Sequence, residues 1–375
     1  MKKLLFLVLL LVLFLGACSS TNDSSTDAAN GADTAKDDKL SVYTTVYPLT
    51  YFTEQIGGDL VEVESIYPAG SNEHTYEPTQ QDMISLAEAD LVFYIGMGLE
   101  GFIDKAQTTL KNENVEFVAT AATIPEEELG EGHSHDHEAE DEHNHEHGDE
   151  EHNHDHEATE EHSHEHEAAD EHNHEHGDEE HNHDHSSTEE HSHDHDHGHS
   201  HGSVDPHVWI SPVLSQQLAE SIKNELVEQD NENAKTYEAN YEALIEELKE
   251  LDQSFQETAD AAANKTFFVS HAAFGYIADT YGLEQVAVAG LNSQDEPSQK
   301  ELTQIVDQAK ELDVRYVAFE QNVSSKLTEV IQKEIGAEAV QLHNLGVLTE
   351  EDVANKETYF TLMEENRKTL EKILN

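Results

Sequence analysis

The chain has 375 residues, 36% of them hydrophobic, and a formal net charge of -62 at pH 7. Residues 126–201 carry 30 acidic and no basic side chains, and this -30 leaves -32 of the -62 for the rest of the chain. Such a balance argues against nucleic acid as a partner, because phosphates would be repelled, and it favours cations. A solubility adaptation to a saline habitat is the alternative explanation of the acidity.

The first 17 residues predict an export signal that ends before a lipidated cysteine. Two lysines precede an apolar run over residues 4–15, and small residues follow it. The run is shorter than the roughly 20 residues that a membrane-spanning helix needs. Residues 15–18 read LGAC and resemble the bacterial lipobox, in which the cysteine is diacylated. Cys18 is the only cysteine, which excludes disulfides and zinc–thiolate sites; the alternative is a cleaved signal whose cysteine is incidental.

Residues 18–39 predict a flexible tether after the lipidated cysteine. They are rich in Ser, Thr, Asn, Asp and Ala and contain almost no apolar side chain to bury. A coil of about 20 residues reaches on the order of 25 Å. We therefore expect an extracytoplasmic folded part, held at the outer face of the cell membrane without entering it.

From residue 40 onward, short β-rich runs alternate with amphipathic segments, and the alternation resumes after residue 264. Two such sets predict the α/β fold class, with two lobes of mostly parallel sheets over residues 40–230 and 264–375. The expected strands cover 40–46, 61–66, 91–94, 266–269, 285–288, 314–319 and 339–342, and the expected early helices cover 83–89 and 99–110.

Residues 231–263 predict one long helix between the two lobes. Apolar side chains recur at steps of three and four, and Asp230 precedes them as the expected N-cap. At 1.5 Å per residue the helix would be roughly 48 Å long. The stripe fits a coiled-coil dimer or, as we favour for a monomer, a rigid connector packed along both lobes. Its members are Ala234, Tyr237, Tyr241, Leu244, Leu248, Leu251 and Phe255.

Residues 126–203 predict a disordered, acidic, histidine-rich insertion in the first lobe. The stretch 133–201 holds 24 of the 28 histidines, and 143–156 is repeated without change at 172–185. A segment without large apolar side chains cannot pack a core. Its alternate histidines can chelate Zn²⁺ weakly and in many registers, best above the imidazole pKa near 6.5. The alternative is a solvated polar spacer.

Only four histidines lie outside the insertion, and three of them follow predicted strands or open a helix. His74 lies in a turn-rich segment after a strand, His207 stands before a helix that Pro212 can start, and His271 ends a buried strand. In α/β folds such loop and strand-end positions carry ligand groups. Each histidine alone is more often a satisfied polar residue, but three together indicate a metal site.

These three histidines lie in segments that resemble the signature stretches of one family. Residues 73–78 read EHTYEP, 205–212 read DPHVWISP and 269–276 read VSHAAFGY. In this order they are similar to the zinc-binding ZnuA/AdcA-type substrate-binding lipoproteins of ABC importers, the metal-binding cluster A-I family. The resemblance covers residues 40–375. It implies two lobes, a rigid helix and a metal ion in the interlobe cleft.

The resemblance also implies a ligand set. His74 and His207 would come from the N-terminal lobe and His271 from the C-terminal lobe. Glu320 stands at a strand end where related proteins place a carboxylate, and it is our preferred fourth ligand. Glu73 and a water molecule are the alternatives, because some relatives use one or the other.

Three imidazoles and one oxygen suit tetrahedral zinc. Manganese relatives have a carboxylate where His271 stands, so His271 favours zinc, although copper or nickel could also bind in vitro. We expect Asp205 and Trp209 to support the ligands by hydrogen bonding or packing. His343 falls where the family has no ligand, and we interpret it as structural.

These features predict a non-enzymatic receptor that binds extracellular Zn²⁺ and delivers it to a membrane ABC permease with a cytoplasmic ATPase. A receptor for Mn²⁺ or another divalent metal is one alternative. A surface lipoprotein that buffers metal or mediates adhesion through its histidine-rich insertion is another. A catalytic zinc site is disfavoured because the sequence has no H-E-x-x-H helix.

Overall fold

The computed structural model describes residues 39–130, 204–322 and 325–375. The predicted export signal, Cys18, the tether and most of the histidine-rich insertion lie outside the described residues. Among the helices of the described ranges, none is long and apolar enough to cross a membrane.

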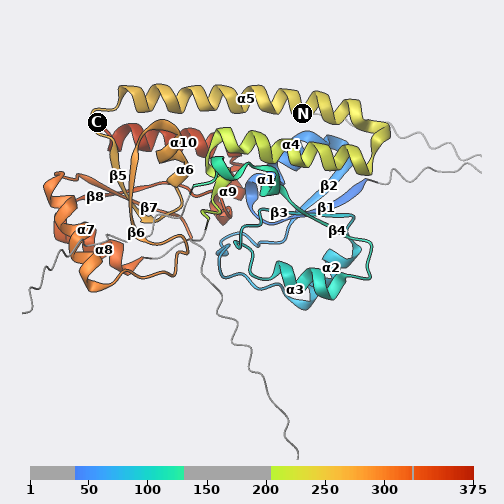
Figure 1. Ribbon diagram of the computed structural model, residues 1–375, viewed down its shortest axis with the longest axis horizontal. Helices are drawn as coiled ribbons and strands as arrows, with labels where there is room; N and C mark the ends of the chain where they lie inside the picture. The colour runs from blue at the N-terminus through green and yellow to red at the C-terminus, as the bar shows by residue number, and fades with distance from the viewer. Residues whose placement is uncertain (1–38, 131–203, 323–324) are drawn as a thin grey trace, which may run out of the picture.

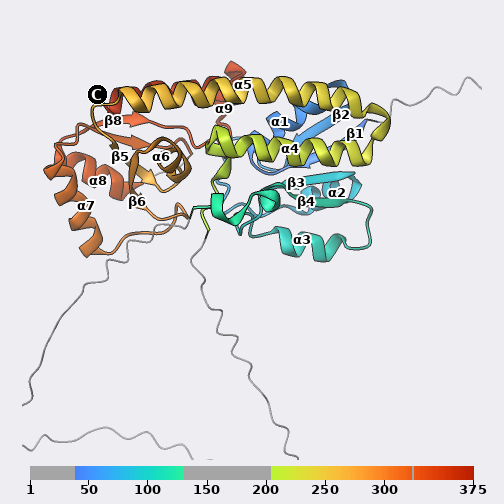
Figure 2. The same ribbon diagram turned by 45° about the horizontal axis from the view of Figure 1, so that its top comes forward.

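The N-terminal lobe is built on a four-stranded parallel sheet in the order β2-β1-β3-β4 (Figure 1). Helices α1 and α4 pack against each other and against the long helix α5, while α2 and α3 lie at the other side of the lobe (Figure 2). The elements are β1 Leu40–Thr44, α1 Tyr47–Gly57, β2 Val61–Ser65, α2 Gln80–Glu88, β3 Leu91–Tyr94, α3 Ile103–Leu110, β4 Glu116–Ala119 and α4 Pro212–Gln229.

The C-terminal lobe repeats the same strand order, β6-β5-β7-β8, again with all strands parallel. The strand order reverses between β5 and β7, because β6 is added on one side of β5 and β7 on the other. Open α/β sheets bind ligands at the carboxyl ends of the strands at such a point. The elements are β5 Thr266–His271, α6 Gly275–Tyr281, β6 Glu284–Ala289, α7 Gln299–Glu311, β7 Tyr316–Phe319, α8 Lys326–Ile335, β8 Glu338–Gln341, α9 Glu350–Asn355 and α10 Tyr359–Ile373.

Helix α5, Ala234–Ala261, runs along both lobes (Figure 1). Its buried side chains face α4 and α1 of the first lobe and α10 and α6 of the second, so the apolar stripe is used within the chain and not in a coiled coil. One hydrophobic core runs without a break from the first sheet through α5 to Phe267 and Tyr359. The prediction of two parallel α/β lobes and a long helix is confirmed.

Two sequence-based expectations about helix starts are wrong. Residues Asn231–Asn233 form a 3-10 turn, and the side chain of Asp230 accepts hydrogen bonds from the side chains of Asn233 and Tyr237 instead of capping a helix. Helix α3 begins four residues later than expected. Residues 99–102 form turns instead, in which the backbone N–H of Leu99 donates to the carbonyl of Gly96 and that of Ile103 to the carbonyl of Glu100, both at 3.2 Å.

A buried hydroxyl in α1 leads to a stability prediction. Thr53 is fully buried, and its Oγ1 has no hydrogen-bond partner among the described residues. We expect Thr53→Val to raise the free energy of unfolding by about 1 kcal/mol, because an unsatisfied buried hydroxyl is replaced by a methyl group of similar size. Urea denaturation measures this. The matched control is Thr44→Val, since Thr44 Oγ1 lies 2.6 Å from Thr50 Oγ1 and the variant must lose that hydrogen bond.

Candidate metal centre

Three histidines from distant parts of the chain meet between the lobes. His74 follows β2 in a loop that Asn72 Oδ1 holds by accepting the backbone N–H of His74 at 3.0 Å. His207 precedes a short 3-10 turn, Val208–Ile210, and His271 is the last residue of β5. As predicted, α4 begins at Pro212. The side chain of Ser211 caps it by accepting the backbone N–H of Leu214.

The imidazole rings of the three histidines face one another. Nε2 of His74 lies 3.3 Å from Nε2 of His207, and the ring centroids are 4.9 to 5.3 Å apart. Each ring offers one nitrogen within 4.8 Å of the other two. Two imidazole ligands of a tetrahedral zinc ion are about 3.3 Å apart, so the separation of His74 and His207 already fits one edge of such a site.

Asp205 sets the orientation of His207. Its Oδ1 accepts from the backbone N–H of His207 at 2.9 Å and lies 2.7 Å from the ring Nδ1. Because a carboxylate only accepts, Nδ1 carries the proton, and the lone pair of Nε2 points to His74. Trp209 packs edge-on against the His207 ring and donates its indole N–H to the carbonyl of Asn344 at 2.7 Å.

His271 has a different set of neighbours. Its Nε2 lies 3.0 Å from the carbonyl oxygen of Leu291, so Nε2 carries the proton. Its Nδ1 lies 2.9 Å from Oε2 of Glu320, which is also an acceptor. Two acceptors this close require a positive charge between them, either a proton on Nδ1 or a metal ion bound by both.

The pKa values of two histidines move in opposite directions. Burial, together with the neighbouring His207 and His271, lowers the pKa of His74 to about 2. Burial also acts to lower the pKa of His271, but the carboxylates of Glu320 and Glu73 outweigh it and raise that pKa to about 9. The pKa of Glu320 is lowered, because the charge of His271 and its hydrogen bonds overcome burial. Without metal and below about pH 9, Nδ1 of His271 therefore carries a proton that lies between it and Oε2 of Glu320.

Glu73 is buried beside this site but is directed elsewhere. Its Oε1 accepts from Nδ2 of Asn344 at 2.9 Å, and burial raises its pKa. The group of three converging ring nitrogens includes neither Glu73 nor Glu320. Both candidate carboxylates are therefore buried near the histidines but lie outside the converging group, and only Glu320 makes a hydrogen bond to one of the three rings.

His343, the fourth outlying histidine, does not join the cluster. Its Nδ1 accepts the backbone N–H of Leu345 at 2.9 Å, and its Nε2 lies 3.0 Å from Asp352. Both ring nitrogens are therefore engaged in the second lobe, in agreement with the structural role expected for this residue.

The histidine-rich insertion joins the fold next to His207. The backbone N–H of Asp205 donates to the carbonyl of Gly130 at 3.2 Å, so the two ends of the insertion are tied together. Tyr276 of the second lobe completes the junction. Its hydroxyl donates to the Asp205 carbonyl at 2.7 Å and accepts from the Gly130 N–H at 3.3 Å.

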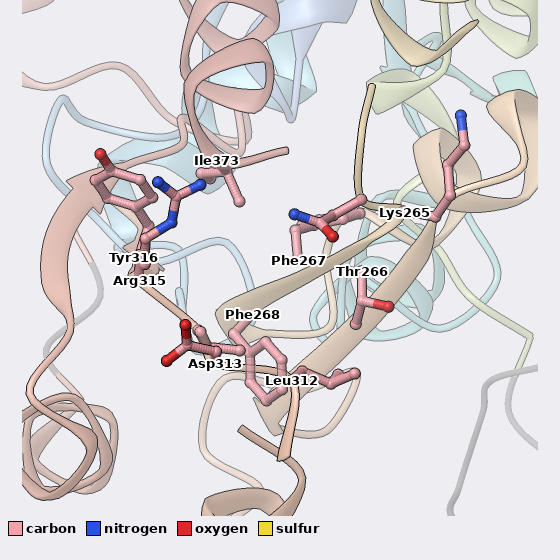
Figure 3. Close-up of a pocket in the computed structure, with 11 residues that line it drawn as sticks. Lys265, Thr266, Phe267, Phe268, Leu312, Asp313, Arg315, Tyr316 and Ile373 are labelled. Atoms are coloured by element: carbon pink, nitrogen blue, oxygen red, sulfur yellow. The ribbon is translucent and has the colours of Figure 1, made fainter. Parts of the chain in front are cut away.

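A pocket of about 90 Å³ lies elsewhere, at the amino ends of β5 and β7 (Figure 3). Lys265, Arg315 and Phe268 are among the residues that line it. Because His271 stands at the opposite end of β5, this pocket belongs to the other edge of the sheet and is not part of the histidine site.

Sequence reasoning missed three residues that organise the site: Asn344, Ser270 and Tyr276. Ser270 donates to Glu320 Oε1 at 2.9 Å. A usable signal existed for two of them, since Ser270 directly precedes His271 and Asn344 directly follows His343, both at the carboxyl edge of the second sheet. No comparable signal marked Tyr276 as the contact between lobes.

Two α/β lobes with a shared core, and a buried histidine cluster to which both contribute, define a two-lobed binding protein whose site suits a metal ion. The chain belongs to the family of zinc-uptake complex component A, periplasmic (ZnuA), whose family model matches residues 42–373.

Individual relatives agree with this family. The chain is 31% identical over 373 residues to the zinc-binding lipoprotein AdcA of Streptococcus pneumoniae, covering 99% of this chain and 60% of that protein. It is 33% identical over 362 residues to the high-affinity zinc uptake system protein ZnuA of Bacillus subtilis, covering 96% and 94%. The crystal structure of the Zn(II)-bound ZnuA-like domain of S. pneumoniae AdcA superposes with a TM-score of 0.62 at 28% identity, covering 90% of this chain and 99% of that one.

Proposed function

We propose that the protein is a zinc receptor that captures one Zn²⁺ ion between its lobes. The main evidence is the convergence of His74, His207 and His271, each of which has a ring nitrogen within 4.8 Å of those of the other two. Neutral imidazoles are common ligands of zinc, whereas harder metals such as Mn²⁺ prefer oxygen ligands. The names of two relatives, a zinc-binding lipoprotein and a high-affinity zinc uptake system protein, support zinc as the cargo.

We propose Glu320 as the fourth ligand. The contact of 2.9 Å between its Oε2 and Nδ1 of His271 is close to the edge of about 3.3 Å expected for two ligands of one tetrahedral zinc ion. A metal ion there would replace the proton that both atoms share. Nε2 of His271 would keep its proton and its hydrogen bond to the Leu291 carbonyl, which fixes the ring as outer hydrogen bonds usually do at metal sites.

The wider role that this supports is delivery of zinc to a membrane ABC permease with its ATPase. We propose that the lipid on Cys18 keeps the receptor at the outer face of the membrane. The chain covers 60% of the length of the pneumococcal relative, so what that whole protein does is carried over here only as a proposal. The protein is proposed to act without catalysis, and hydrolytic activity that disappears in His74→Ala would contradict this.

Metal stoichiometry tests the proposal. Residues 131–203 are replaced by a short Gly-Ser linker. Such a linker can span the gap, because Gly130 and Asp205 are hydrogen-bonded to each other. We expect this chain to bind one tight zinc ion, measured by metal analysis after dialysis and by competition titration. The full mature chain, measured beside it, should bind the same tight ion and additional weaker ones. A shortened chain that binds no tight zinc would contradict the proposal.

A further inference from the structure

One buried amide connects the two carboxylates at the metal centre. Asn344 follows β8 and is only 2% exposed. Its backbone carbonyl accepts the indole N–H of Trp209 from the first lobe, and its backbone N–H donates to Oε1 of Gln321 at 3.2 Å. The backbone of Asn344 is thus held by hydrogen bonds to both lobes.

The orientation of the Asn344 amide follows from its neighbours. Oδ1 accepts the backbone N–H of Gly346 at 3.0 Å and the side-chain amide of Gln321 at 2.9 Å. A backbone N–H can only donate, so the oxygen must be on this side and the NH₂ group on the other.

The NH₂ group then faces two carboxylates from opposite lobes. Nδ2 lies 2.9 Å from Oε1 of Glu73 and 2.9 Å from Oε2 of Glu320. An amide nitrogen has two hydrogens, so each carboxylate receives one. The two acidic side chains are therefore placed by one shared donor group.

Glu73 is confined on its other side as well. A methyl group on Gly346 would lie only 2.7 Å from Glu73 Oε1 and 2.8 Å from its Cδ, so the carboxylate fills the space that the glycine leaves open. Glu320, by contrast, keeps contact with His271 through the same oxygen that Asn344 holds. The carboxylate of Glu73 is thus held by Asn344 and Gly346, whereas that of Glu320 faces His271.

We propose that Asn344 is a specificity-determining positioning residue, which holds Glu73 away from the bound metal and leaves Glu320 as its only carboxylate ligand. The inference rests on the proposed zinc site. Withholding Glu73 keeps the ligand set at three nitrogens and one oxygen, which suits tetrahedral zinc, whereas a second carboxylate would favour higher coordination and harder metals such as Mn²⁺.

The test uses Co²⁺ as a spectroscopic probe in the full mature chain, with the visible absorption of the tight site recorded at one equivalent. In Asn344→Ala we expect the intensity to fall about twofold or more and the preference for Zn²⁺ over Mn²⁺ to fall about tenfold, because Glu73 is free to coordinate. The double variant Asn344→Ala with Glu73→Gln should recover both properties. Loss of structural support alone would not be rescued in this way.

Three results would overturn the inference. They are an unchanged spectrum and preference in a folded Asn344→Ala chain, a failure of the double variant to recover, and a loss of about tenfold or more in zinc affinity for Glu73→Gln alone. The last measurement remains decisive if Asn344→Ala does not fold. Asn240→Ala, which removes a hydrogen bond of 2.9 Å to Ile56 far from the site, controls for general destabilisation. If the unmodified chain binds neither Co²⁺ nor Zn²⁺ tightly, the proposed function itself fails.

Discussion

Replacing His271 with alanine is expected to lower the affinity for zinc roughly 1000-fold, or about 4 kcal/mol. The variant removes one of three converging imidazoles and leaves the buried carboxylate of Glu320 without the partner that lies 2.9 Å from it. Competition titration of the tight site, with a chelator of known affinity, measures the change.

His343→Ala is the matched control for this variant. His343 is also buried and also contacts a carboxylate, at 3.0 Å from Asp352, but it lies outside the cluster. We expect it to destabilise the fold while changing zinc affinity less than about threefold. Equal losses of zinc affinity in the two variants would mean that the cluster is not the binding site.

Zinc affinity is expected to rise about 100-fold between pH 6 and pH 8 and to level off near pH 9. The pKa of His271 is raised to about 9, so below that pH a zinc ion must displace the proton between Nδ1 and Glu320. The pKa of His74 is lowered to about 2, so this ring is already unprotonated over the whole range. Competition titrations at several pH values, with calorimetry in two buffers to count released protons, measure the slope.

The same pKa values give the sign of the stability change without metal. Because the folded-state pKa of His271 is raised above 6.5, the stabilisation from its protonated form is complete below about pH 6.5 and is lost as the pH rises through about 9.

Glu320→Gln removes the main cause of the raised pKa of His271, so the pH dependence of zinc binding should move to lower pH. A variant with an unchanged profile would show that another group releases the proton.

Local pattern predicted the strands and the histidine positions well. His271 stands at the end of β5, as the buried run before it indicated, and Glu320 directly follows β7. These positions could be predicted because the carboxyl ends of neighbouring parallel strands meet at one edge. Strand β4, Glu116–Ala119, was not predicted, although it contains Phe117 and Val118; it is a short strand of four residues at the edge of the sheet.

The contacts that organise the site could not be predicted, because they depend on how the lobes pack. Asn344 reaches Glu73 across 271 positions of sequence, and Tyr276 reaches Gly130 across 146. The position of Asn344 beside His343 gave a signal for the residue itself, but nothing in the local sequence marks the partner of either residue. The identity of the fourth ligand stayed open for the same reason, since Glu73 and Glu320 approach each other only in the folded chain.

The closed junction between Gly130 and Asp205 has an evolutionary consequence. Gly130 and Asp205, at the ends of the insertion, are hydrogen-bonded to each other and to Tyr276. Their positions in the fold therefore need not change when the number of residues between them changes. In general, the entropic cost of closing a loop grows only with the logarithm of its length, by about 0.6 kcal/mol of free energy for each doubling. We therefore expect that histidine-rich repeats can be gained or lost by duplication at little cost in stability, so that the number of histidines in the insertion can change in evolution without a change at His74, His207 and His271.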